Sequence, residues 1–178
     1  MSQVESAASQ PEATVPAEAI DRFIARYETR QEDWEVFAFQ EQADPRYRRS
    51  QMRYVGGGGT EKHDDPNTLP PGHFTLSILT LPPGHGGPMH YHETEEVFFV
   101  LEGEVTCQWQ APDGRIYERT LKKYDAILNP PGVPHCFWNK TDQPARFNIM
   151  VGAARPKPPV YTDPKIEELR RQARAQGR

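Results

Sequence analysis

The chain has 178 residues, which is enough for one domain with a buried core. Its apolar fraction of 36% is low and its 18 prolines are many, which fits a compact β core with polar, irregular tails better than a helical bundle. The net charge of −4 and a pI near 5.9 give no reason to expect nucleic acid or an anionic membrane as partner, so a small ligand is expected.

A secretory signal is not expected at the N-terminus. Residues 1–15 have neither a basic start nor an apolar stretch, and no run of the chain approaches the ~20 apolar residues of a membrane span. The two cysteines, Cys107 and Cys136, are too few for a disulfide framework and fall in expected strands. Two buried reduced thiols are therefore expected, with a redox or crosslinked role as the alternative, and the protein is predicted to be cytoplasmic.

Residues 1–15 are predicted to form a disordered tail. Residues 16–72 are predicted to form an arm that precedes the main domain. Apolar side chains at i, i+3, i+4 and i+7 predict a short amphipathic helix from Ile20 to Tyr27, with one face that needs a cover. Alternating patterns then predict strands at 34–39 and 47–55. The arm is expected to pack on the main domain or on a partner subunit.

The second of these strands is strongly basic. Arg46, Arg48, Arg49 and Arg53 most simply form a solvated edge that discourages unwanted strand pairing. The alternative is a contact with a substrate carboxylate or phosphate, which the planar guanidinium binds with two hydrogen bonds. Glycines 56–59 follow without the Lys-Ser/Thr pair or the helix start of a phosphate-binding loop, so they indicate a flexible connection or a lid.

Residues 73–152 contain many short strand patterns separated by turn signals, such as Asp113-Gly114. Strands are expected at 74–81, 89–92, 95–101, 104–110, 115–121, 124–128, 135–138 and 146–151. A succession of this kind predicts an all-β sandwich or barrel. Residues 153–178 are predicted to form a proline-rich extension and a short helix that is capped by Asp163 and begins at Pro164.

Four residues in the expected barrel could share one metal ion. His90 and His92 are two apart, so on a strand they point to the same face, and Glu96 continues that parity. His135 follows a proline-glycine turn further along the chain. Three neutral imidazoles and one carboxylate suit a first-row divalent metal, and four ligands out of six leave positions open for chemistry.

The residues around these ligands have a characteristic spacing. The first stretch has Gly84, His90, His92, Glu96 and Gly103, and the second has Pro130, Gly132, His135 and Asn139. In this register the sequence resembles the two motifs of the cupin superfamily, in its single-domain form. The resemblance implies a double-stranded β-helix (jelly-roll barrel) with short terminal helices, and it implies His90, His92, Glu96 and His135 as metal ligands.

The second motif departs from the family pattern at one position. Tyr124 stands six residues before Pro130, where the family usually has a glycine. The turn there is accordingly expected not to need a positive φ. Every ligand position is nevertheless filled.

Strand parity also predicts the walls of a pocket. The expected lining residues are Phe98, Val100, Trp109, Phe137, Phe147 and Ile149, which would make it mostly apolar with few polar anchors. His85 and Tyr91 are candidate catalytic groups because they lie close to the ligands in sequence. A surface histidine is the simpler interpretation of His85, and Tyr91 points away from the ligands in a regular strand, so the general acid or base stays unidentified.

Cupins similar to this chain include dioxygenases, decarboxylases, isomerases and lyases, and the fold does not choose among them. We expect a metal-dependent enzyme for a small oxygenated or carboxylated metabolite that chelates one divalent transition metal, Fe, Mn, Ni, Zn or Co. The alternative is a non-catalytic cupin that binds or senses a small molecule. Single-domain cupins commonly pair through arms like residues 16–72, so a homodimer is expected, without nucleic-acid or membrane partners.

Overall fold

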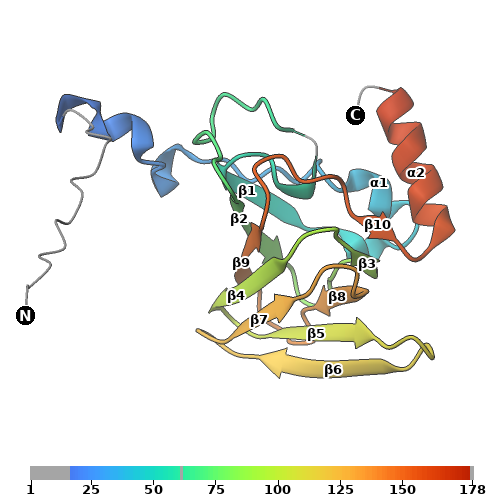
Figure 1. Cartoon of the computed structure of the whole chain (residues 1–178). Helices are drawn as coiled ribbons and strands as arrows, with labels where there is room; N and C mark the ends of the chain where they lie inside the picture. The colour runs from blue at the N-terminus through green and yellow to red at the C-terminus, as the bar shows by residue number, and fades with distance from the viewer. Residues whose placement is uncertain (1–16, 61, 177–178) are drawn as a thin grey trace, which may run out of the picture.

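The computed structural model describes residues 17–60 and 62–176, and the tail expected to be disordered, residues 1–15, lies outside these residues. Two five-stranded antiparallel sheets pack face to face (Figure 1), which confirms the predicted jelly-roll barrel. The first sheet has the order β1 (Ser50–Val55), β2 (Thr75–Leu81), β9 (Ala145–Val151), β4 (Glu96–Glu102), β7 (Ala126–Asn129). The second has the order β10 (Val160–Tyr161), β3 (His90–Tyr91), β8 (His135–Trp138), β5 (Val105–Gln110), β6 (Ile116–Leu121).

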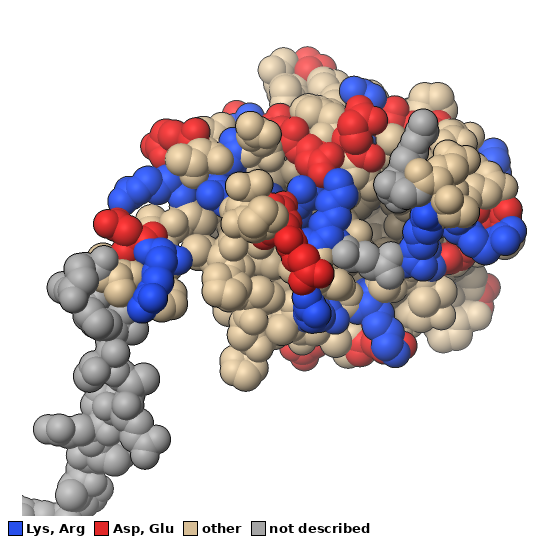
Figure 2. Space-filling view, turned by 90° about the horizontal axis from the view of Figure 1, so that it is seen from above, with Lys and Arg blue, Asp and Glu red and all other residues tan. Residues whose placement is uncertain are grey.

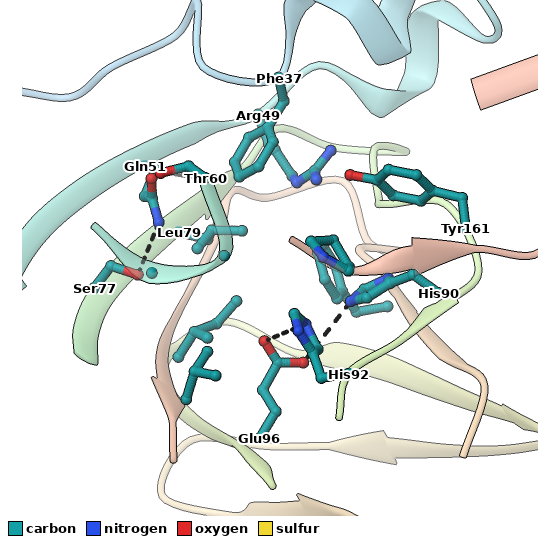
Figure 3. Close-up of a pocket in the computed structure, with 16 residues that line it drawn as sticks. Phe37, Arg49, Gln51, Thr60, Ser77, Leu79, His90, His92, Glu96 and Tyr161 are labelled. Atoms are coloured by element: carbon teal, nitrogen blue, oxygen red, sulfur yellow. Dashed lines mark hydrogen bonds and ion pairs between the residues drawn. The ribbon is translucent and has the colours of Figure 1, made fainter. Parts of the chain in front are cut away.

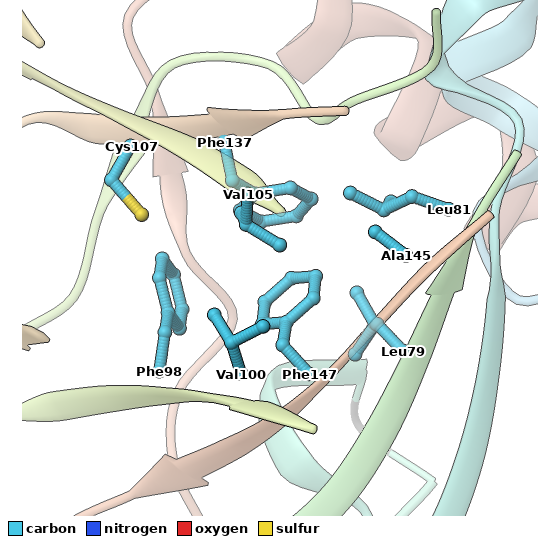
Figure 4. Packing of buried hydrophobic residues seen from close by; sticks show 9 residues of the cluster. All are labelled: Leu79, Leu81, Phe98, Val100, Val105, Cys107, Phe137, Ala145 and Phe147. Carbon is cyan, nitrogen blue, oxygen red and sulfur yellow. The ribbon is translucent and has the colours of Figure 1, made fainter. Parts of the chain in front are cut away.

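The hydrophobic core lies between the two sheets (Figure 4). Three phenylalanines meet at its centre with edge-to-face rings: Phe98 and Phe137 have centroids 5.4 Å apart, Phe98 and Phe147 5.2 Å, and Phe137 and Phe147 5.0 Å. Leu79, Leu81, Val100, Val105, Cys107 and Ala145 complete the cluster. Cys107 and Cys136 are both buried and free, as predicted.

The arm joins the barrel as a strand and then departs from the prediction. Its strand β1 pairs antiparallel with β2, with Met52 opposite Ile78. The strand expected at 34–39 is wrong, because the chain turns there and then forms the short helix α1 (Ala38–Glu41). The cause is Asp33, whose Oδ1 accepts the backbone N–H groups of Glu35 and Val36 at 3.0 Å each and so bends the chain out of an extended path.

The predicted amphipathic helix is replaced by two short 3₁₀ segments, Ala17–Phe23 and Tyr27–Thr29, which lie away from the barrel (Figure 1). Its apolar side chains are 58%, 52%, 42% and 56% exposed at Ile20, Phe23, Ile24 and Tyr27. An isolated stretch this short forms a regular α-helix poorly unless its apolar face is packed, which accounts for the broken helix.

The C-terminal extension returns over the open end of the barrel. Strand β10 pairs with β3, and helix α2 (Pro164–Ala175) then packs against α1. The predicted cap is confirmed, since the Asp163 carboxylate accepts the backbone N–H of Lys165 at 2.8 Å and Pro164 opens the helix. Among residues 17–60 and 62–176, no helix has the length and apolar character needed to cross a bilayer.

The turn before β7 contradicts the expectation drawn from Tyr124. This residue has a φ of 75°, the left-handed conformation that glycine adopts without strain. The reason lies in the contacts of the loop with β4: the Tyr124 N–H donates to the Val100 carbonyl at 2.9 Å, and the Val100 N–H donates to the Asp125 carbonyl at 3.0 Å. Tertiary hydrogen bonds thus impose the positive φ on a tyrosine.

Candidate metal centre

Three strands bring the four predicted ligands together. His90 belongs to β3, Glu96 begins β4 and His135 begins β8, while His92 directly follows β3. In the β3–β8 pair His90 lies opposite His135, with ring centroids 4.7 Å apart, so strand register accounts for the approach of two residues distant in sequence. All four side chains are buried, and their ligand atoms lie within 4.8 Å of one another.

Glu96 stands at the centre of the cluster. Its Oε2 lies 2.8 Å from His135 Nε2 and 3.8 Å from His90 Nε2, and its Oε1 lies 3.4 Å from His92 Nε2. The Nδ1 atoms of His90 and His135 lie 2.8 Å from the carbonyls of Pro88 and Val133. A carbonyl only accepts, so each Nδ1 carries the proton and each Nε2 faces the cluster, as in metal-binding histidines.

The ionisation states of His90 and Glu96 also suit a metal. Burial lowers the pKa of His90 to about 4, so its imidazole is neutral at neutral pH. Burial acts to raise the pKa of Glu96, but the positive charge of His92 and the close contacts with the histidine rings hold it well below its usual 4.5. A neutral imidazole and an ionised carboxylate are the forms that bind metal, so the four residues could hold a divalent transition metal.

A cavity of about 50 Å³ lies beside the ligands, with His92 and Glu96 on one side and Phe37, Arg49 and Tyr161 on the other (Figure 3). Its wall is more polar than predicted, because Gln51 and Ser77 also face it, joined by a hydrogen bond of 3.2 Å. The other lining residues are Gly58, Gly59, Thr60, Leu79, His90, Phe137, Ile149, Val151 and Pro159.

Of the six side chains predicted to form the pocket, only Phe137 and Ile149 line the cavity. Phe98, Val100 and Phe147 lie instead in the core. The two-residue period of a strand correctly predicted that Phe98 and Val100 point inward with Glu96. Glu96 lines the cavity, whereas Phe98 and Val100, further along β4, are buried in the core between the sheets. Trp109 is also outside the lining and donates its indole N–H to Asn129 Oδ1 at 2.8 Å.

The two candidate catalytic residues do not line the cavity either. His85 lies in the loop before β3, where its Nδ1 is 2.8 Å from the Pro83 carbonyl. Tyr91 lies between His90 and His92 in sequence and is only partly buried, whereas both neighbours are buried. Tyr91 thus points away from the ligands, as expected for side chains that alternate between the two faces of a strand.

On the far wall, sequence reasoning offered Arg49 only as one of four arginines that could contact a substrate anion, and it missed Gln51 and Tyr161. Arg49 and Gln51 are two residues apart, so in an extended chain their side chains point to the same face. This spacing was the signal from which a polar inward face could have been predicted. Gln40 lies behind Arg49, and Tyr161 reaches the cavity from β10. Their inward placement depends on how the arm and the C-terminal extension fold over the barrel, which no local pattern reveals.

The comparisons with known proteins agree with this geometry. Residues 77–152 match the family model of the cupin domain. Auxin-binding protein ABP19b of Prunus persica is 39% identical over 73 residues, which cover 40% of this chain and 35% of that protein. A germin-like protein of Morus alba is 30% identical over 84 residues, which cover 47% and 40%. The chain thus spans well under half the length of these curated relatives.

Solved structures of oxalate oxidase share the fold. One, from a study of the mechanism of oxalate oxidase, has a TM-score of 0.56 at 15% identity and covers 89% of this chain and 73% of its own. Another, recombinant oxalate oxidase in complex with glycolate, has a TM-score of 0.50 at 18% identity and covers 64% and 54%. At these identities the likeness concerns the fold alone. With its two motifs, its jelly-roll barrel and its matching segment, the chain carries a cupin domain over residues 77–152.

Proposed function

We propose that the chain is a metal-dependent enzyme that acts on a small oxygenated or carboxylated metabolite, which chelates the metal. The supporting observation is a buried cluster of three histidines and one glutamate beside a small cavity. Four protein ligands leave positions free for a substrate on a metal that accepts six. When bound, a divalent transition metal supplies Lewis-acid stabilisation of a developing negative charge or, if it is iron, activation of oxygen.

The side chains around the cavity favour an oxygenase or a decarboxylase over an isomerase or a lyase that needs a protein base. Among the described lining residues, the titratable groups besides the ligands are Arg49 and Tyr161. Burial raises the pKa of Tyr161 to about 12 and lowers that of Arg49 to about 10, so both stay protonated at neutral pH. Neither can remove a proton from a substrate, which disfavours the lyase and isomerase reactions that begin with proton removal by a protein base.

Metal analysis of the purified protein tests the site. We expect about one transition-metal ion per chain in the wild type and little in His92→Ala, because this substitution removes one of four ligands. His85→Ala is the matched control, since His85 lies outside the cavity and should leave the metal content unchanged. Equal metal content in wild type and His92→Ala contradicts the proposed site.

Turnover separates the enzyme from the binding or sensing alternative. The names of the structural relatives make oxalate and glycolate reasonable first compounds, each tested with the metal-loaded protein and with oxygen uptake as the readout. Conversion that stops when the metal is removed supports the enzyme. Binding without conversion, unchanged by metal removal, contradicts it.

We also propose a homodimer in which the start of the arm, residues 20–27, of a second copy covers the outer face of the first sheet. Two unpartnered apolar surfaces support it. The first is the exposed row from Ile20 to Tyr27. The second is a row of apolar residues across neighbouring strands: Leu128 lies opposite Val97, Val97 opposite Met150, and Met150 opposite Leu76. Leu128 and Met150 are exposed.

Light scattering at micromolar concentration tests the assembly. We expect the mass of a dimer for the wild type and a lower mass for Phe23→Asp, because a charge in an apolar interface is costly. Ile116→Asp is the control, since Ile116 is similarly exposed but lies on β6 in the other sheet. A monomeric wild type rules out the dimer.

A further inference from the structure

The four arginines of the basic segment have different environments. Three of them form ion pairs with carboxylates: Arg46 with Asp44 at 2.6 Å, Arg48 with Glu41 at 3.2 Å, and Arg53 with Asp33 and Asp65 at 3.0 Å each. On the face of the molecule drawn in Figure 2, Lys and Arg side chains lie among Asp and Glu side chains. Arg49 alone among the four has no carboxylate of the described residues within ion-pair distance, so the solvated-edge interpretation fails for it.

Arg49 is buried, with 4% of its surface exposed. Its Nη1 donates to Gln40 Oε1 at 2.7 Å and to the Tyr47 carbonyl at 2.9 Å. Its Nε is also buried and has no hydrogen-bond partner in the described part of the chain. A buried cation is normally paired with an anion and a buried donor is normally hydrogen-bonded, so this guanidinium lacks an anionic partner.

The guanidinium lines the cavity on the wall opposite the metal ligands (Figure 3). Its Cζ lies 3.8 Å from the ring centroid of Phe37 and 5.5 Å from that of Phe137, and Gln40 is itself held by a hydrogen bond of 2.7 Å to the Tyr161 hydroxyl. These contacts fix the orientation of the planar group. They account for its position but leave Nε without an acceptor among the described residues, and a guanidinium can bind a carboxylate with two parallel hydrogen bonds.

We propose that Arg49 binds a carboxylate of the substrate while a second oxygenated group of the same molecule chelates the metal at His90, His92, Glu96 and His135. The inference rests on the proposed function and narrows its substrate class to small acids whose carboxylate is separate from the chelating atoms. Arg49 lies outside the residues that match the cupin family, 77–152, so this specificity belongs to the arm of this chain.

The charges of the site favour such a ligand. A divalent metal with the one carboxylate of Glu96 and three neutral imidazoles carries a net charge of +1, and Arg49 adds another at neutral pH, since its pKa of about 10 keeps it protonated. A small site with two positive charges complements a doubly charged anion. Dicarboxylates with a hydroxyl beside one carboxylate combine this charge with a chelating group.

Two pairs of 2-hydroxy acids test the role of Arg49 by calorimetric titration of the protein loaded with redox-inert Zn²⁺. Hydroxymalonate is compared with lactate, and malate with 2-hydroxybutyrate, so that each pair shares the chelating group and differs by a carboxylate in place of a methyl group. In the wild type we expect at least one dicarboxylate to bind about 10- to 100-fold more tightly than its partner, as for hydrogen bonds to charged groups.

Arg49→Gln should bring this ratio close to one while leaving the Kd of the monocarboxylates and the zinc content nearly unchanged. Arg48→Gln is the matched control, because it removes the same charge one residue away, where Arg48 is exposed and paired with Glu41. A ratio that persists in Arg49→Gln, or one that Arg48→Gln abolishes equally, overturns the role of Arg49.

A second variant keeps Arg49 in place, in case Arg49→Gln does not fold. Gln40→Glu puts a carboxylate where the Gln40 amide now accepts from Arg49 Nη1, so an internal anion competes with the ligand. We expect a folded, zinc-loaded protein with the same loss of discrimination. Full discrimination in this folded variant argues against the proposal.

The controls also separate the two proposals. If both acids of each pair bind the wild type equally and only in the presence of zinc, the metal site stands and the carboxylate contact is refuted. If neither acid binds in a zinc-dependent way, the proposed function fails and the inference fails with it. Only zinc-dependent binding with a preference that Arg49→Gln abolishes supports both.

Discussion

The two walls of the cavity come from different parts of the chain. The wall with the candidate metal ligands is built from β3, β4 and β8, all within the cupin domain, and family motifs specify its residues. The facing wall, with Phe37, Arg49 and Tyr161, comes from the arm and the C-terminal extension, outside that domain. The difference indicates a division of labour in which the barrel would supply metal chemistry and the flanking segments would select the ligand.

The two walls are also held by different forces. The ligands begin or border strands of a barrel whose centre is filled by three packed phenylalanines. The facing wall depends instead on a chain of buried hydrogen bonds from Arg49 through Gln40 to Tyr161. Changes in one wall should therefore leave the other largely intact, and this separation can be tested.

The largest effect is expected in the barrel wall. Glu96→Gln removes the only negative ligand, and metal affinity should fall roughly 100-fold or more, since four-ligand zinc sites gain about 10–16 kcal/mol in total. Competition with a chromogenic chelator measures this loss. Glu95→Gln is the control, because the neighbouring Glu95 is exposed.

The same assay on Arg49→Gln sharpens the comparison. Because Arg49 lies on the facing wall, its substitution should change metal affinity by no more than a few-fold. A loss as large as that of Glu96→Gln would show that the two walls act as one unit.

A smaller effect is expected from Tyr161→Phe in the facing wall. The substitution removes the hydroxyl that accepts from Gln40 Nε2 at 2.7 Å and leaves a buried amide without this partner. The free energy of unfolding should fall by about 1–3 kcal/mol, while metal affinity stays unchanged. Denaturant titration measures the loss, and Tyr117→Phe, at an exposed tyrosine, should have little effect. Reduced metal affinity in Tyr161→Phe would break the proposed separation.

The same division explains how much the sequence could predict. The ligands His90, His92 and Glu96 followed from the two-residue period of a strand, and the family spacing added His135, whose approach depends on the β3–β8 register. Arg49 could not be distinguished from its three neighbours, because its burial is caused by packing of the arm and the extension over the barrel. The misplaced strand at 34–39 has a local cause, the Asp33 side chain, that strand alternation does not register.

The smallest effect is expected at Tyr124, in a barrel turn that belongs to neither wall. Its φ of 75° costs a tyrosine roughly 1–2 kcal/mol, and asparagine tolerates this conformation better. The exposed ring contributes a cation–π contact, with Lys123 Nζ 4.9 Å from its centroid, which offsets part of that strain. Tyr124→Asn should therefore stabilise the fold by about 0.5–1 kcal/mol in denaturant titration.

In this variant metal affinity and the preference for dicarboxylates should both stay at their wild-type values. Such a result would show that changes in global stability alone alter neither wall. A shift in either binding property without a stability gain would mean that the Tyr124 turn is coupled to the site through β4, whose Val100 holds the turn and whose Glu96 is a candidate ligand. The division between barrel and flanking segments would then have to include the turns of the barrel.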